Sequence, residues 1–317
     1  MRRFFTFGAW MLLGCAVAAA TPEVVISGIP YTSAGHAAAG CGLYPARDGA
    51  GLGFAKGGER LQFTPEKPLC TYNGVKVHQC FPARRRNGLL YVSTLDLSKT
   101  LLPLSSARTG VVRHRVLSIT IDPGHGGRDQ GAATRRLREK IATLLIARRV
   151  GEILRTCGYR VNLTRDSDCY VPLGERCRLQ RTARSDLFVS IHVNAAANRS
   201  LQGIETYALT PAGAASTSGG KPSRTNFGGN RNDANNLLLA YLIQRALLRR
   251  TRAVDRGVKR ARFAVLRDIN VPGVLVEVGY LSNPREEQLL LDPAYREKLA
   301  RGIAEGIIVY RHAVSRK

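Results

Sequence analysis

Residues 119–132 read Ile119-Thr-Ile-Asp122-Pro123-Gly124-His125-Gly126-Gly127-Arg-Asp129-Gln-Gly131-Ala132. The apolar run ends at an acid, a proline and a histidine flanked by glycines, which indicates a buried strand followed by a tight loop. Residues 187–195, Leu-Phe-Val-Ser-Ile-His192-Val-Asn194-Ala, repeat this arrangement. Open α/β sheets build their sites at the carboxyl ends of strands, so we expect both histidines at one sheet edge.

The C-terminal region, 117–317, alternates between apolar runs and helical periodicity, which predicts an α/β fold with a mostly parallel sheet flanked by helices. In the last helix Leu299, Ile303, Ile307 and Tyr310 recur at helical spacing and predict a buried face. We expect strands at 117–122, 159–164, 186–191, 203–209, 261–266 and 273–278, and helices at 138–156, 173–183, 232–251, 284–291 and 293–312.

Residues 22–107 have a different character, with many glycines, prolines and turn signals between short alternating runs. The stretch Cys70-Thr-Tyr-Asn73-Gly74-Val-Lys-Val77 predicts a β-hairpin, because Asn-Gly between β-forming residues favours a tight turn. No histidine or carboxylate cluster occurs here. We predict a small β-rich accessory domain with a binding or structural role.

Residues 1–20 have the pattern of a signal peptide: Arg2-Arg3, then the apolar run Phe4–Ala18, then small residues suited to cleavage. This predicts export to the periplasm or cell envelope. Leu12-Leu-Gly-Cys15 resembles a lipobox, so a lipid anchor at Cys15 is an alternative to simple cleavage.

Six cysteines follow the predicted signal peptide: Cys41, Cys70, Cys80, Cys157, Cys169 and Cys177. An even number in an exported protein predicts disulfides, with Cys70–Cys80 and Cys169–Cys177 as local pairings. Buried thiols are the alternative. No C-x-x-C spacing occurs, which argues against a zinc site built from cysteine.

The chain has 48 Lys+Arg against 23 Asp+Glu, a formal net charge of +25. This charge favours anionic partners such as envelope polymers. No RNA-binding aromatic signature or zinc-finger spacing is present, so we expect no nucleic acid partner. Solubility alone is an alternative reason for the charge.

Residues 210–236 are rich in Gly, Ser, Asn and Pro and carry little apolar content. A loop of this length is often functional, so we expect it to border the site. A solvated insertion without a role is the alternative.

His125 and His192 are candidate ligands of a catalytic zinc ion, which prefers imidazole and carboxylate ligands. The other four histidines lie in less suitable segments, so an acid must complete the set. Glu139 opens a predicted helix 14 residues after His125 and is our candidate. Alternatively, Glu139 is a surface acid placed favourably at a helix N-terminus.

Glu277 lies in the apolar run Val274-Leu-Val-Glu277-Val-Gly279. A buried carboxylate is costly unless it is paired or functional, and Glu277 suits a general base. Asp122 is expected to orient His125 or cap its loop, and Asn194 to orient His192, as supporting groups do in metal sites. Both could instead be ordinary turn residues.

Several separated motifs together resemble the zinc-dependent N-acetylmuramoyl-L-alanine amidases of the type-3 class. They are His125-Gly-Gly, Glu139, Ser190-Ile-His192-x-Asn194 and Val276-Glu277-x-Gly279-x-Leu281-Ser-Asn283, supported by Thr164-Arg165-Asp166, Leu173-x-Glu175-Arg176 and Glu205-Thr-Tyr207. The resemblance covers about 117–312. It implies that His125, Glu139 and His192 bind Zn²⁺, and that Glu277 is catalytic.

The resemblance also implies the substrate, peptidoglycan, cut at the amide between the muramic acid lactyl group and L-Ala of the stem peptide. Some members of this family carry a self-inhibiting helix, which the polar segment 210–236 does not resemble. The accessory region is similar to the small domain of copper amine oxidases. The alternatives are a zinc carboxypeptidase acting within stem peptides and a non-catalytic envelope-binding protein.

Overall fold

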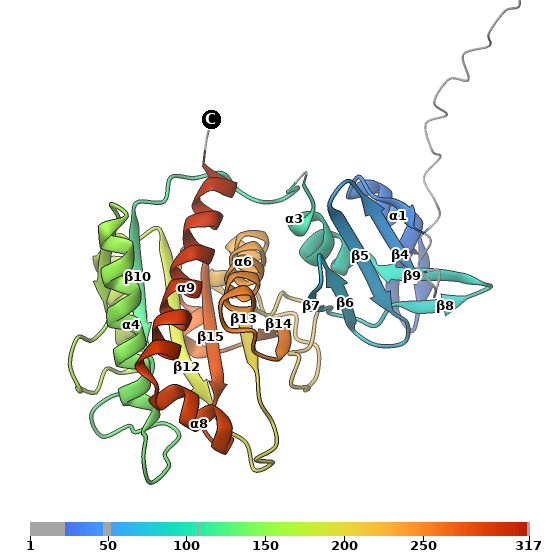
Figure 1. Cartoon of the computed structure of the whole chain (residues 1–317). Coiled ribbons are helices and arrows are strands. Elements are labelled where there is room, and N and C mark those ends of the chain that lie inside the picture. Colours follow the sequence, from blue (N-terminus) through green and yellow to red (C-terminus); the bar gives the residue numbers. More distant parts are fainter. Residues whose placement is uncertain (1–22, 47–51, 107, 316–317) are drawn as a thin grey trace, which may run out of the picture.

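The computed structural model describes residues 23–46, 52–106 and 108–315. The predicted signal peptide and Cys15 lie outside the described residues. A long sheet runs through the molecule, from the C-terminal region, where helices pack on it, into the β-rich N-terminal region (Figure 1). No helix within the described ranges combines the length and apolar character needed to cross a membrane.

Six strands of the C-terminal region occur in the order β11-β10-β12-β15-β13-β14. The first four are parallel to one another, whereas β13 and β14 run antiparallel to β15. The prediction of a mostly parallel sheet is confirmed. The strands are β10 (Ser118–Pro123), β11 (Arg160–Leu163), β12 (Leu187–Asn194), β13 (Ile204–Leu209), β14 (Asp255–Ala261) and β15 (Gly273–Tyr280).

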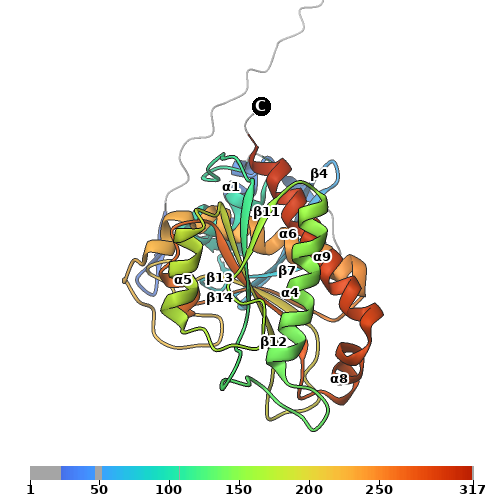
Figure 2. The same cartoon turned by 90° about the vertical axis from the view of Figure 1, so that its left-hand side faces the viewer.

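Helices cover both faces of this part of the sheet (Figure 2). The larger core lies between the sheet and α4 (Glu139–Thr156), α6 (Asp233–Thr251) and α9 (Pro293–Val314). A smaller core on the other face includes α5 (Leu173–Thr182) and α7 (Ala264–Arg267). The last two helices are joined closely, with α8 (Pro284–Leu291) just before α9.

The predicted apolar face of α9 is confirmed, because Leu299, Ile303, Ile307 and Tyr310 are all fully buried. Helix α9 packs directly on α6, and glycine allows the close approach. A Cβ atom added to Gly306 would lie 2.5 Å from the Cα of Ile243.

The N-terminal region is β-rich, as predicted. Strands β1, β2, β9 and β8 form a small sheet, and β7-β6-β5-β4-β3 continue the large one. The hairpin of β6 and β7 turns at Asn73 and Gly74, both with positive φ, so that prediction is also confirmed. The strands are β1 (Val24–Ile26), β2 (Ile29–Ser33), β3 (Tyr44–Ala46), β4 (Gly53–Lys56), β5 (Glu59–Thr64), β6 (Leu69–Tyr72), β7 (Val75–His78), β8 (Arg84–Arg86) and β9 (Leu89–Ser93). The helical segments are α1 (Ala34–Gly40), α2 (Thr94–Asp96), η1 (Leu97–Leu101) and α3 (Leu102–Leu104).

The two regions are joined edge to edge. Strand β7 pairs in parallel with β14 through Val77 and Val258, so the large sheet has eleven strands. The fully buried Arg260 of β14 donates to the carbonyl of Lys99, at 2.6 Å. This pairing covers the edge of β14, which would otherwise expose unpaired backbone groups.

The strand predicted at 261–266 is wrong. A strand does occur in this region, but it lies earlier, as β14, and α7 occupies residues 264–267. The sequence did not predict β14 because the strand contains charged residues. The structure explains these charges, since Arg256 and Lys259 pair with the buried Glu205.

The segment 210–236 was expected to border the site. Because β13 is antiparallel to β15, however, the segment begins at the end of the strands opposite the metal ligands. The segment is irregular only as far as Phe227. The short helix η2 (Gly228–Asn232) then leads into α6.

The predicted disulfides are also not found, since all six described cysteines are free. Cys70 is buried and its thiol donates to the carbonyl of Val77. Cys177 is buried in the smaller core whereas Cys169 is exposed, which explains why that local pair is not joined.

Gly306→Ala should destabilise the protein, because the new methyl group would press on the α6 backbone at Ile243. We expect a loss of about 1–3 kcal/mol in the free energy of unfolding, typical of overpacking. Gly174→Ala is the control, since a Cβ there meets nothing within 4 Å. Denaturant unfolding measures both, and equal stabilities would contradict the close packing of α6 and α9.

Candidate functional site

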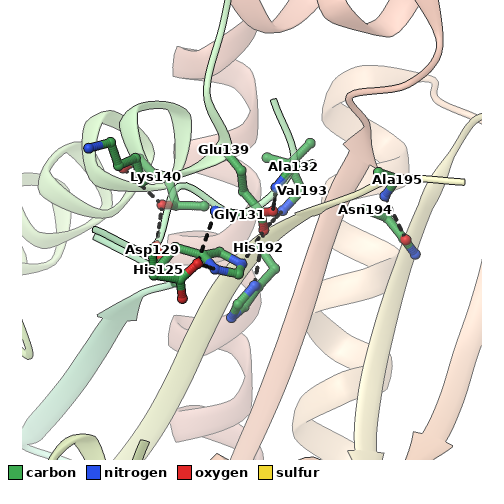
Figure 3. Close-up of polar contacts among 12 residues, drawn as sticks. His125, Asp129, Gly131, Ala132, Glu139, Lys140, His192, Val193, Asn194 and Ala195 are labelled. Atoms are coloured by element: carbon green, nitrogen blue, oxygen red, sulfur yellow. Dashed lines mark hydrogen bonds and ion pairs between the residues drawn. The ribbon is translucent and has the colours of Figure 1, made fainter. Parts of the chain in front are cut away.

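His125, Glu139 and His192 come together at the carboxyl edge of the sheet (Figure 3). One ligand atom from each lies within 4.8 Å of the other two. Oε1 of Glu139 is 3.1 Å from Nε2 of His125 and 3.0 Å from Nδ1 of His192. The sequence-based grouping of these three residues therefore corresponds to one cluster, contributed by the loop after β10, the start of α4 and the end of β12.

Glycines make room for this cluster. A Cβ at Gly124 would lie 2.5 Å from Nε2 of His192, and one at Gly131 would lie 2.5 Å from Oε2 of Glu139. His125 itself adopts a φ of 61°, which is uncommon for a residue with a side chain. Strained backbone of this kind is found at functional sites, where the surrounding structure holds it in place.

Three buried cations hold the loop that carries His125. Arg176 donates to the carbonyls of Pro123 and His125, at 2.7 and 2.8 Å. Arg165 donates to the carbonyl of Gly124 at 2.8 Å, and Lys140 to that of Gly127 at 2.8 Å. These contacts account for the two arginine-containing motifs, whose roles the sequence did not reveal.

Asp122 does not contact the imidazole of His125, which corrects one of our two expectations for it. It is fully buried and accepts hydrogen bonds from Arg176, Thr164 and Ser190, at 2.5–2.7 Å. Burial alone would raise the pKa of Asp122, but Arg176 and the two hydroxyls hold it below its ordinary value. Asp122 therefore stabilises the loop indirectly, by orienting Arg176.

The acid beside His125 is Asp129, which sequence reasoning missed. Its Oδ1 lies 2.9 Å from Nδ1 of His125, on the opposite side of the ring from Glu139. The available signal was its place in the same glycine-rich loop, four residues after the histidine. Asp129 leaves Nε2 of His125 directed toward the cluster.

Glu139 is buried, and both of its carboxylate oxygens accept hydrogen bonds. Its Oε1 also accepts from the backbone N–H of Val193, and its Oε2 from that of Ala132, at 3.0 and 2.8 Å. Burial alone would raise the pKa of Glu139, but the hydrogen bonds and charges of the two imidazoles hold it well below its ordinary value. Our alternative, a surface acid at a helix terminus, is wrong because Glu139 is only 4% exposed.

Glu277 lies beside this cluster. It is opposite His192 in the β12–β15 pair and opposite Glu205 in the β15–β13 pair. Its Oε2 is buried and has no hydrogen-bond partner among the described residues. Burial raises the pKa of Glu277 well above its ordinary value, and the negative charges of Glu139 and Glu205 add to the increase.

Asn194 does not orient His192, so that expectation is wrong. Its side chain donates to Oε1 of Glu205 at 2.8 Å. Glu205 is 1% exposed and also pairs with Arg256, at 3.0 Å, and with Lys259. The sequence revealed Glu205 only as part of a motif. Its ion pairs involve two cations of β14, which is separated by β13 from the strand β15 that carries Glu277.

A cavity of about 180 Å³ opens beside the two histidines. Its wall is largely apolar, and besides the histidines Asp122, Asp129 and Arg176 contribute polar groups to it. No described residue of segment 210–236 lines it. The apolar side chains are those of Tyr170, Val171, Leu173, Phe263, Ala264, Val265 and Leu275.

The cluster fits a zinc ion. Two imidazoles and a carboxylate are ligands that zinc prefers, and catalytic zinc sites use three protein ligands. The glycines leave space around these side chains, and the unpartnered oxygen of Glu277 lies at their side. The arrangement can support hydrolysis, with one carboxylate as ligand and a second free to move protons.

Comparison with known proteins agrees with this geometry. The N-acetylmuramoyl-L-alanine amidase family matches residues 119–309. The chain belongs to this family. Over 222 residues it is 37% identical to the N-acetylmuramoyl-L-alanine amidase AmiC of Neisseria meningitidis, a match that covers 61% of this chain and 52% of the relative. The chain thus spans about half of that protein, but 76% of AmiA from Escherichia coli, to which it is 36% identical over 219 residues and 61% of its own length.

A solved structure shows the same fold. The catalytic domain of CwlV, an amidase from Bacillus (Paenibacillus) polymyxa var. colistinus, matches with a TM-score of 0.52 and 32% identity. The match covers 62% of this chain and 98% of that domain. Residues before 119 lie outside the family match, so the amidase family accounts for the C-terminal region.

Gly124→Ala should weaken metal binding without removing a ligand, because the added methyl group would displace the His192 ring. Disturbing the support of a ligand typically costs roughly 10–100-fold in metal affinity. Gly35→Ala, where a Cβ meets nothing within 4 Å, is the control. Titration of the metal-free protein with zinc measures both, and an unchanged affinity for Gly124→Ala would contradict the close contact.

Proposed function

We propose that this protein is a zinc-dependent amidase that cuts peptidoglycan between the lactyl group of muramic acid and L-Ala of the stem peptide. The observation that carries the proposal is the cluster of His125, Glu139 and His192 beside the buried, unpartnered Oε2 of Glu277. Membership of the amidase family supports the choice of substrate.

Each residue has a role in this proposal. His125, Glu139 and His192 would hold zinc, which when bound activates water and polarises a carbonyl group. Oε2 of Glu277 accepts a proton from the attacking water. The new C–O bond forms at the lactyl carbonyl, the C–N bond breaks, and Glu277 returns the proton to the departing amine of L-Ala.

The cavity suits small apolar groups close to the scissile bond. Its volume, about 180 Å³, is below the range of sites for drug-sized ligands. We propose that its wall, which includes Leu173 and Phe263, contacts the methyl groups that flank the amide. The longer parts of the polymer then lie outside it. Such a substrate requires export, as the predicted signal peptide at 1–20 implies.

We further propose that the β-rich region is an accessory domain, 22–107, and that segment 210–236 does not inhibit the site. Support comes from segment 210–236, which contributes no residue to the cavity. The purified protein should therefore be active without an activator.

Mass spectrometry of digested peptidoglycan tests the proposed function. The expected products are glycan with an intact lactyl carboxylate and complete stem peptides that begin with free L-Ala. Loss of a terminal D-Ala with the lactyl amide intact would show a carboxypeptidase instead. Binding without any cleavage would support a non-catalytic envelope protein.

Glu139→Ala and Glu277→Gln should fail differently. Glu139→Ala removes a proposed ligand, so zinc content and activity should fall together. Glu277→Gln should keep zinc but lose roughly 10²–10⁴-fold in turnover, the typical contribution of a general acid–base. Metal analysis and kinetics on the same preparations separate the two roles, and the reverse pattern would mean that they are exchanged.

Lys259→Met should move the acid limb of the pH–rate profile to higher pH. Burial, Glu139 and Glu205 raise the pKa of Glu277, and Lys259 opposes them. Without this cation the pKa of Glu277 rises further, so a larger fraction is protonated and unable to act as a base at a given pH. Lys298→Met, which removes an exposed lysine of α9, is the control. A limb that stays in place or moves to lower pH would refute this.

A further inference from the structure

A cluster of arginines occupies the end of the sheet opposite the metal ligands. Four separate segments meet there: the linker before β10, the start of β11, the turn before β12 and the end of α9. Contacts join them, since Arg160 N–H donates to the carbonyl of Leu117, Asp186 N–H to that of Ser118, and His114 N–H to that of Val314. Figure 1 shows the linker and the C-terminal end of α9 together at the top. We call this surface the arginine end; its members are Arg108, Arg113, Arg115, Arg160, Arg184 and Arg311.

None of these six guanidinium groups forms an ion pair with any described residue. Elsewhere on the protein arginines are commonly paired, as Arg250 is with Glu305, at 2.7 Å, and Arg301 with Glu297, at 2.6 Å. Within segments 108–118, 159–161, 184–187 and 311–315 the one acidic residue is Asp186. Its Oδ2 accepts hydrogen bonds from the backbone N–H groups of Leu117 and Ser118, at 2.8 and 2.9 Å.

The surface is also shaped. A hollow of about 560 Å³ is lined by His114, Arg115, Val116, Arg311 and Ser315. Arg311 is held over the ring of Tyr159, 5.1 Å from its centroid, and Arg108 by a hydrogen bond of 3.0 Å to the carbonyl of Ala313. These contacts fix two of the guanidinium groups while leaving their charges unpaired.

We propose that the arginine end is a second binding surface for the substrate polymer, where it receives carboxylates of a stem peptide other than the one being cut. This rests on the proposed function, because peptidoglycan carries the same anionic peptide many times. Guanidinium groups bind carboxylates in a bidentate manner. The six residues of β10 place this surface roughly 20 Å from the scissile bond, so a different part of the polymer reaches it.

A second contact of this kind acts through effective concentration. Binding at one point of a polymer brings its other repeats close to the catalytic edge, so the two weak contacts together retain the enzyme on an insoluble substrate. The contact at the arginine end is electrostatic and exposed, so it should weaken with salt.

The test compares two triple variants of the full chain, each also carrying Glu277→Gln to prevent digestion. One replaces Arg113, Arg115 and Arg160 with Gln at the arginine end. The control replaces Arg249, Arg250 and Arg301, which are exposed but ion-paired with Glu305 and Glu297. Both lose three positive charges. Co-sedimentation with purified peptidoglycan sacculi over a range of salt concentrations gives the affinities.

At low salt we expect the first variant to bind sacculi about tenfold more weakly than the parent protein, which carries Glu277→Gln alone. The control should bind less than about twofold more weakly than that parent. Both values follow from the usual size of exposed charge contacts. Sacculi whose carboxylates have been amidated should bind the parent protein as weakly as intact sacculi bind the first variant. The single variants Arg115→Gln and Arg160→Gln should each show part of the loss.

Equal losses in the two triple variants would overturn the proposal, because bulk charge alone would then explain binding. Full binding of the parent to amidated sacculi would also overturn it and would point to phosphate-bearing polymers or nucleic acid. With Glu277 restored, both triple variants should cleave a soluble muramyl peptide at the parent rate; a loss confined to the first would show that the surface is not separate from the site. Failure of the parent itself to cleave that peptide would contradict the proposed function and leave the binding comparison intact.

Discussion

The rest of the site depends on the contacts of the Glu139 carboxylate with the imidazoles of His125 and His192. The three side chains come from two strand ends and a helix start, so they meet only if α4 packs on the sheet with its first turn beside the ends of β10 and β12. Close approach requires glycine at positions 124 and 131. A buried carboxylate also needs compensation, which the two imidazoles and two backbone N–H groups supply.

The direction of one strand shapes the surroundings of this cluster. Because β13 runs antiparallel to β15, Glu205 lies opposite Glu277, which in turn lies opposite His192. Glu205 in turn pairs with Lys259, whose charge opposes the increase in the pKa of the proposed base. The same antiparallel direction means that segment 210–236 begins at the opposite end of the strands, and none of its described residues lines the cavity. One topological feature thus places Glu205 opposite Glu277 and keeps the described residues of segment 210–236 out of the cavity lining.

The sequence predicted those parts of the fold and site that local patterns encode. Continuous apolar runs placed β10, β12 and β15, and helical periodicity identified the buried face of α9. The residue types and positions of His125, Glu139, His192 and Glu277 pointed to one metal site. What failed depended on contacts between distant segments. Strand β14 carries charged residues and no apolar pattern, and its charges are explained only by their pairing with the distant Glu205. The partner of Asn194 is also Glu205, on a strand whose direction no local pattern indicates. Asp122 acts through Arg176, 54 residues away, and no local pattern reports that contact.

The central claim is that His125, Glu139 and His192 form a zinc site, and X-ray absorption spectroscopy of the zinc-loaded protein tests it most directly. The account predicts one zinc ion per chain with only nitrogen and oxygen ligands, two of them imidazoles, at about 2.0–2.2 Å. Substitution of Glu139 by Ala should change the oxygen contribution and leave both imidazoles. A sulfur shell at about 2.3 Å would contradict the account, because it would assign the metal to the free cysteines instead.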